Sequence, residues 1–235
     1  MSSGFFGFFA HTGMLMALED EGLLPSRVTG SSAGALIGGL WASGLSARDL
    51  SRELTVLTRE DFWDPRLGFG LLRGKRFREK LRAMLPNDQF ESARVPVSIS
   101  VYDVMSRSTR VMSAGAMSHA IHASCAVPFL FHPVWIDGRP YLDGGILDRP
   151  GLESVPDGER VFYHHLSSRS PWRRRGSKSL EVPKREALTA LVIDTLPRVG
   201  PYKLHVGKAA LDHAYRTTQA ALERPIEDGA VRVSS

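Results

Sequence analysis

The sequence predicts an α/β fold, because short β-favouring runs alternate with longer segments whose apolar residues recur at helical spacing. Strands interleaved with helices are typical of a three-layer α/β/α domain with a central, mostly parallel sheet. The 235 residues suit one large domain or two small ones. Hydrophobic residues make up 43% of the chain and charged residues 23%, as in ordinary globular proteins.

The first quarter of the chain predicts three helices around one short strand. Gly22 stands where a helix C-terminal cap belongs, Gly44 ends a second helix, and Ser46 is placed as the N-cap of a third. In order, the predicted elements are a helix at 11–22, a strand at 26–30, and helices at 32–44 and 46–58.

The rest of the chain continues the alternation. A basic amphipathic helix ends before Pro86, and a hairpin is predicted to turn at Asp137-Gly138. The elements expected here are helices at 74–85, 117–127 and 206–223, the last closing the fold, and strands at 95–104, 110–115, 134–145, 160–166 and 187–196. A Ser- and Arg-rich segment at 167–179 is predicted to be a basic loop.

A candidate nucleophile lies between the first strand and the second helix. Gly30-Ser31-Ser32-Ala33-Gly34 matches G-x-S-x-G with Ser32 at its centre. A serine on a sharp strand-to-helix turn needs small neighbours, and the helix that follows directs its N–H groups toward developing negative charge. The alternative interpretation is an ordinary turn in which Ser31 caps the helix.

A candidate base follows much later. Asp143 ends a β-like run and precedes Gly144 and Gly145, which let the backbone approach another element closely. The alternative is a surface turn. Only about 29 residues precede this G-x-S-x-G motif, too few for the α/β-hydrolase arrangement. The later histidines are His164, His165, His205 and His213, and none of them has a turn-like setting. Of the pair in the strand at 160–166, we expect one side chain to be buried and the other exposed.

Together the stretches "VTGSSAGALIGGL" and "ASCAVPFLFHPVWIDGRPYLDGGILD", with the helix before them, resemble the patatin-like phospholipase family. The resemblance covers residues 4–150 and implies a single patatin-like domain over 1–235, with 151–235 adding C-terminal strands and a helix. It also implies a Ser–Asp dyad that cleaves lipid acyl esters without metal or cofactor. Ser32 falls on the nucleophile, Asp143 on the aspartate, and the supporting glycines are Gly30, Gly34, Gly144 and Gly145.

The family's oxyanion loop, G-x-G-x-x-G, corresponds here to "SSGFFG", which implies Gly4, Phe5 and Gly7 as the oxyanion hole. Ser2 replaces the first glycine, and no strand precedes the loop. Losing one oxyanion donor lowers rates by about 10²–10³. We therefore expect either that the true N-terminus lies upstream of Met1 or that this version of the chain is truncated, and that the sheet lacks one strand beside the elbow. The alternatives to a hydrolase are an impaired lipid- or partner-binding protein and an acyltransferase using the same dyad.

Composition limits the partners. Net charge is +5, and ten Lys/Arg stand against four Asp/Glu between Arg66 and Arg110. Leu and Phe mixed with six Lys/Arg at 68–85 fit either a helix on an anionic membrane or a plain surface helix. The basic clusters carry no recognisable nucleic-acid-binding module, so we expect the protein not to bind nucleic acid. One cysteine and no signal-like start predict a cytoplasmic protein, at most peripheral to a membrane. The four phenylalanines at 5–9 fit core packing or an apolar lip beside the catalytic loop.

Overall fold

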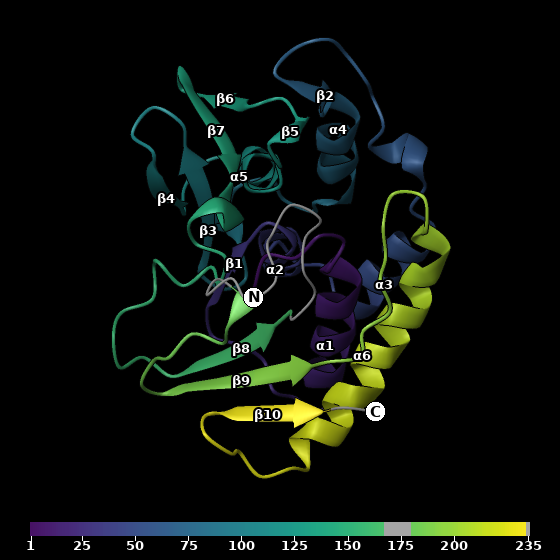
Figure 1. Cartoon of the computed structure of the whole chain (residues 1–235), viewed down its shortest axis with the longest axis vertical. Coiled ribbons are helices and arrows are strands. Elements are labelled where there is room, and N and C mark those ends of the chain that lie inside the picture. The colour runs from purple at the N-terminus through teal and green to yellow at the C-terminus, as the bar shows by residue number, and fades with distance from the viewer. Residues whose placement is uncertain (167–179, 234–235) are drawn as a thin grey trace.

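The computed structural model describes residues 1–166 and 180–233, so the predicted basic loop at 167–179 lies outside the described residues. Helices and strands alternate through the chain (Figure 1). The α-helices are α1 (Phe8–Asp20), α2 (Ala33–Ala42), α3 (Ala47–Thr55), α4 (Lys75–Met84), α5 (Met117–Ser124) and α6 (Gly207–Leu222). The strands are β1 (Val28–Ser31), β2 (Gly70–Leu72), β3 (Val97–Asp103), β4 (Ser108–Met112), β5 (Phe129–Phe131), β6 (Val134–Ile136), β7 (Arg139–Asp143), β8 (Val161–His165), β9 (Leu188–Ile193) and β10 (Ala230–Val233).

The strands form three sheets, of which the central one is mixed and the other two are parallel. In the central one, β3 pairs in parallel with β1 and antiparallel with β4 and β7, and β7 pairs with β6 in a hairpin. A second sheet is entirely parallel, in the order β10-β9-β8. The third is the parallel pair β2–β5. The α/β prediction is confirmed, and the parallel pairs outnumber the antiparallel ones among the described strands.

Residues Met1–Ser3 lie between the central sheet and the β8–β10 sheet. The Met1 amine donates to the Thr29 carbonyl at 2.8 Å, and the Ser31 N–H donates back to Met1 at 3.4 Å, the pattern of a parallel strand pair. On the other side, the Ser2 N–H donates to His164 at 3.3 Å. The expected gap beside the elbow strand is therefore occupied by this short extended segment, which continues the parallel order from β8 to β1.

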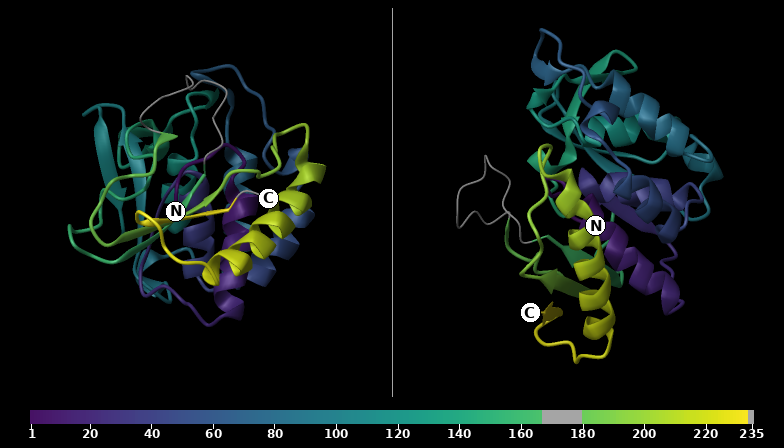
Figure 2. Two further views of the ribbon diagram at one scale, coloured as in Figure 1. Left: turned by 60° about the horizontal axis from the view of Figure 1, so that its bottom comes forward. Right: turned by 90° about the vertical axis from the view of Figure 1, so that its right-hand side faces the viewer.

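Two apolar clusters lie on opposite faces of the sheets. All six α-helices contribute to the larger core, which packs on Ile99 and Val101 of β3 and on Leu191 and Ile193 of β9. α1 and α6 lie side by side in this layer (Figures 1 and 2). The smaller cluster joins the other face of β8 and β9 to side chains from 152–155 and from Val182. Among the described residues, helices thus form one outer layer, and irregular segments form the other.

Most predicted elements are present, with informative differences. Gly22 and Gly44 have positive φ just after α1 and α2, and the Ser46 hydroxyl accepts the Asp49 N–H in a capping box. His164 and His165 are both buried, because both faces of β8 are covered. α6 does not close the fold, since β10 follows it. No helix in 1–166 or 180–233 is long and apolar enough to cross a membrane.

Candidate active site

The register of the central sheet brings the predicted serine and aspartate together. β1 runs along one edge of β3 until Ser31 pairs with Ser100, and β7 runs in the opposite direction until Asp143 pairs with Val101. Since β4 occupies the other edge of β3, the C-terminal ends of β1 and β7 meet at adjacent residues. The Ser32 hydroxyl then donates a hydrogen bond to Asp143 Oδ2 at 2.7 Å.

Ser32 sits on a sharp turn between β1 and α2. Its φ and ψ are 52° and −115°, a backbone conformation that is unfavourable for residues other than glycine. A Cβ at Gly30 would lie 2.4 Å from the Gly34 carbonyl carbon, and one at Gly34 would lie 2.2 Å from the Met1 oxygen. The turn therefore tolerates only small neighbours. Neither serine caps α2 through its side chain, so the alternative of an ordinary turn capped by Ser31 finds no support.

Asp143 is 5% exposed and is held by its own loop. The Gly145 N–H donates to Asp143 Oδ1 at 2.7 Å, which leaves Oδ2 facing the serine. A Cβ at Gly144 would lie 2.0 Å from the Ser100 oxygen, so the loop packs directly on β3. The carboxylate is thus buried and oriented, unlike the side chain of a surface turn.

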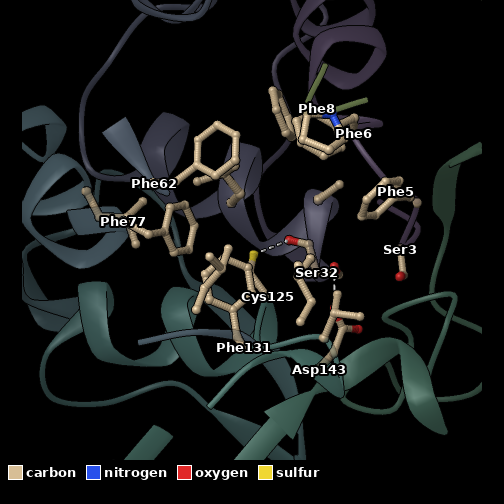
Figure 3. A pocket seen from close by; sticks show the side chains of 18 of the residues that line it. Ser3, Phe5, Phe6, Phe8, Ser32, Phe62, Phe77, Cys125, Phe131 and Asp143 are labelled. Atoms are coloured by element: carbon tan, nitrogen blue, oxygen red, sulfur yellow. Dashed lines mark hydrogen bonds between the residues drawn. The ribbon is translucent and has the colours of Figure 1, made fainter. Parts of the chain in front are cut away.

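Two residues that the sequence did not single out contact the elbow from the C-terminal end of α5, and Figure 3 shows the second of them, Cys125, next to Ser32. The Ser124 hydroxyl accepts the Ser32 N–H at 2.8 Å and donates to the Ser100 carbonyl at 2.7 Å. The Cys125 thiol donates to the Ser32 carbonyl at 3.4 Å. Burial and the nearby Asp143 charge raise the pKa of this thiol above its ordinary value, so it stays protonated. The sequence signal that could have identified Ser124 is its place as a small polar residue on the buried face of a largely apolar helix.

The structure separates the three residues predicted for the oxyanion hole. Gly4 and Phe5 lie in the cavity wall with Ser32, whereas Gly7 does not. The Gly7 N–H closes a turn by donating to the Gly4 carbonyl at 2.9 Å, and α1 begins one residue later. Its N–H is engaged within this turn, so we retain only Gly4 and Phe5, together with the N-terminus of α2, as candidate oxyanion donors.

Buried contacts hold the segment that leads into this loop. The Ser2 carbonyl accepts a hydrogen bond from His11 Nε2 at 2.8 Å, and His11 Nδ1 lies 2.9 Å from His164 Nδ1. Since a carbonyl only accepts, His11 carries its proton on Nε2 and accepts one from His164. Burial lowers the pKa of His11 to about 3 and also lowers that of His164, so both rings stay neutral. No histidine lines the cavity in the part of the chain that the structure describes.

An apolar cavity of about 680 Å³ opens beside Ser32 and Asp143. Figure 3 shows phenylalanine side chains on several sides of this cavity: Phe5, Phe6, Phe8, Phe62, Phe77 and Phe131. Phe5, Phe6 and Phe8 line it while Phe9 is buried in the core, so the N-terminal aromatics serve both predicted roles. The apolar side chains that α2, α3 and α4 contribute are Ala33, Leu36, Leu40, Leu54, Phe77, Leu81 and Met84. The apolar face of α4 thus points inward, which favours a plain amphipathic helix over one lying on a membrane.

Comparison with known proteins agrees with this geometry. A family model described as patatin-like phospholipase matches residues 1–155. The chain is 31% identical over 143 residues to an uncharacterized NTE family protein of Mycobacterium tuberculosis, covering 60% of this chain and 40% of that protein. It is 27% identical over 154 residues to neuropathy target esterase sws of Drosophila sechellia, covering 60% and 10%. The chain therefore spans less than half the length of these relatives.

Among solved structures, the chain is similar to VipD from Legionella pneumophila, with a TM-score of 0.56 and 17% sequence identity. The match covers 82% of this chain and 48% of VipD. At this identity the likeness concerns the fold. The matched share is larger than residues 1–155, so part of the chain after residue 155 also shares this fold.

Proposed function

The chain belongs to the patatin-like phospholipase family, and on this premise we propose that it hydrolyses acyl esters of lipids with Ser32 as nucleophile and Asp143 as base. The observation that carries the proposal is the 2.7 Å hydrogen bond between these side chains in the wall of an apolar cavity. A carboxylate is a weak base in water. It becomes effective where water is excluded and the developing oxyanion is stabilised.

The proposed reaction has two halves. Asp143 Oδ2 accepts the proton of Ser32 as Oγ attacks the acyl carbonyl, and the Gly4 and Phe5 N–H groups with the start of α2 stabilise the oxyanion. Asp143 then gives the proton to the departing alkoxide, which leaves an acyl group on Ser32. In the second half, Asp143 takes a proton from water, the hydroxide attacks the acyl-enzyme, and Ser32 recovers its proton from Asp143.

The cavity supports a lipid acyl chain as the group bound. Leu36 and Leu40 follow Ser32 at four-residue steps along α2, so this wall extends for about 12 Å. An extended alkyl chain advances about 1.25 Å per bond, given tetrahedral carbons about 1.5 Å apart, so roughly nine or ten carbons lie along it. We therefore expect esters of medium-length acyl chains to be cleaved faster than acetate esters.

We also propose that residues 1–235 act as one domain. The buried contact between His11 of α1 and His164 of β8 joins the motif-bearing part to the C-terminal part. Packing of α6 along α1 joins them again. Both contacts lie next to the segment that carries Gly4 and Phe5, so removal of residues after 155 should abolish the site.

Labelling with a fluorophosphonate probe tests the dyad. Wild-type protein should be labelled, Ser32→Ala should not, and Asp143→Asn should react about 10²–10⁴-fold more slowly. Ser31→Ala is a matched control, because the Ser31 hydroxyl is buried and forms no hydrogen bond with any of the described residues, so its loss should leave labelling unchanged. An unlabelled wild type, or equal labelling of Ser32→Ala, would exclude the proposal.

Product analysis separates the related outcomes. Nitrophenyl ester turnover with free fatty acid as product supports hydrolysis, whereas acyl transfer to added alcohol or lysolipid indicates a transferase using the same dyad. If the wild type binds lipid but neither reacts with the probe nor cleaves esters, the protein is the impaired binding form considered from the sequence.

A further inference from the structure

A short hairpin next to the cavity carries apolar side chains that the described residues leave exposed. Pro65 pairs with Leu72, and the Arg66 N–H donates to the Leu71 carbonyl at 2.9 Å, so residues 65–72 fold back on themselves. At the tip, Leu67 is 99% exposed and Phe69 is 88% exposed. Adjacent exposed apolar side chains of this size mark an interaction site rather than ordinary surface.

Phe129 adds a third exposed apolar side chain from a distant part of the chain. β2 pairs with β5 so that Gly70, the residue after Phe69, lies opposite Phe129, and these two strands lie at one end of the molecule (Figure 1). Phe129 is 89% exposed and has a φ of 65°, in a turn closed by the Leu130 N–H on the Val127 carbonyl at 3.1 Å. A bulky residue is disfavoured in this left-handed conformation, and burial does not compensate it here.

The flanks of the hairpin are positively charged. Arg66, Arg73, Lys75 and Arg76 are all exposed, and among the described residues Arg66 and Arg73 form no ion pair. The nearby Asp64 carboxylate is occupied by the backbone N–H groups of Gly74 and Arg76. Exposed apolar side chains surrounded by cations match the boundary between the headgroups and acyl chains of an anionic bilayer.

The apolar tip is continuous with the cavity. Phe129 is exposed and also lines the cavity, as do Trp63 and Pro201. On that side the Arg59 guanidinium lies 4.9 Å from the centre of the Trp63 ring and 5.2 Å from that of Tyr202, which is 71% exposed. Trp and Tyr side chains favour the membrane–water boundary. A bilayer that contacts the tip therefore faces the cavity.

We propose that Leu67, Phe69 and Phe129, the apolar tip, insert into the outer part of an anionic lipid bilayer and bring the cavity to the membrane surface. This proposal gives the proposed lipid hydrolase its route to substrate, but membrane binding is measured without any hydrolysis. The apolar tip differs from the membrane-surface helix that the sequence suggested at 68–85. The apolar side chains of α4 line the cavity, whereas Leu67 and Phe69 in the hairpin before α4 are exposed.

Vesicle sedimentation of the full chain carrying Ser32→Ala tests this proposal, since that variant leaves the lipid intact. It should bind vesicles of phosphatidylcholine mixed with phosphatidylglycerol more tightly than phosphatidylcholine alone. Adding Leu67→Ser, Phe69→Ser or Phe129→Gly should each weaken binding by about tenfold. Leu24→Ser and Ile226→Ser, at exposed apolar positions outside the tip, are the matched controls and should bind as the parent does.

Three outcomes overturn the proposal: absence of vesicle binding, equal binding by tip and control variants, or loss of a dimer in tip variants, which would identify a contact between two copies of the chain. Phe69 and Leu67 lie outside the cavity wall. The double variant L67S/F69S with Ser32 intact should therefore cleave soluble short esters like the wild type. Vesicle binding without any ester cleavage would instead refute the proposed hydrolase and leave the membrane proposal standing.

Discussion

Replacing Ser124 by alanine should damage the site although Ser124 takes no part in the proposed chemistry. The residue is fully buried at the end of α5. Its hydroxyl accepts the Ser32 N–H and donates to the Ser100 carbonyl. It therefore ties a turn in a disfavoured conformation to the strand on which β1 and β7 meet. Ser124→Ala removes both bonds, one from a buried N–H and one from a buried C=O.

The expected magnitude follows from these two groups. A buried polar group left without a partner costs about 1–3 kcal/mol, and partial relaxation brings the sum for two to roughly 2–4 kcal/mol. For a chain of this length, each kcal/mol lowers Tm by about 2–4 °C, so the variant should melt roughly 4–16 °C below the wild type. A turn displaced by about 1 Å should also lower turnover by about 10²-fold.

Thermal melting followed by circular dichroism and turnover of a soluble nitrophenyl ester measure the two effects. Ser118→Ala is the matched control, because Ser118 is a buried serine on the same helix whose hydroxyl donates to Asp88 at 2.7 Å, away from the elbow. It should lower Tm by a few degrees and leave turnover unchanged. Our reasoning is refuted if Ser124→Ala melts and turns over like the wild type. Equal loss of turnover in both variants would assign the effect to α5 as a whole.

Two further predictions concern the fold around the site. Gly30→Ala should yield no folded, probe-reactive protein, because its Cβ would lie 2.4 Å from backbone atoms of the neighbouring turn; a soluble variant that reacts with the probe would contradict this. Stability should fall with acid, because burial lowers the pKa of both His11 and His122 to about 3 while each returns to about 6.5 on unfolding. The neutral forms stabilise the fold fully above about pH 6.5, and each histidine should remove about 2 kcal/mol by pH 5. Urea unfolding at about pH 7 and about pH 5 measures this loss, His122→Leu should reduce it by about 2 kcal/mol, the share of that one histidine, and equal stability at both values would disprove it.

Local signals in the sequence predicted the elements that local geometry decides. Asp137 and Gly138 have φ values of 49° and 73°, as a two-residue hairpin turn requires, and Asp-Gly is the dipeptide that tolerates both. The elements missed are β2, β5 and β10, which have three or four residues each. β2 and β5 exist through pairing with each other across more than fifty residues of chain, and no local pattern records such a partner.

The candidate dyad could be predicted from the sequence, whereas the residues that position it could not. Ser32 and Asp143 each stand in a motif whose glycines are required by close backbone contacts. Ser124 and Asp148 have no such mark, because the contacts that tie each of them to β1 or β3 reach residues distant in sequence. The Asp148 carboxylate accepts the Ser100 hydroxyl at 2.6 Å and the Gly151 N–H at 2.9 Å, which packs the chain after Asp143 onto β3. These contacts depend on the assembled sheet, so only the structure reveals them.

The departure of Ser2 from the glycine of the family's loop takes on a different meaning in the structure. Its hydroxyl donates to the His164 carbonyl and accepts the Leu166 N–H, both at 3.0 Å, while its own carbonyl is held by His11. Glycine can make none of the side-chain bonds. The serine therefore anchors the segment before Gly4 to β8 on one side, as Met1 anchors it to β1 on the other. A loop fixed at both edges holds the Gly4 and Phe5 N–H groups in one orientation, which is what a preorganised oxyanion site requires. The serine at this position thus favours a working loop over the impaired protein considered from the sequence, and Ser2→Gly should weaken turnover rather than restore it.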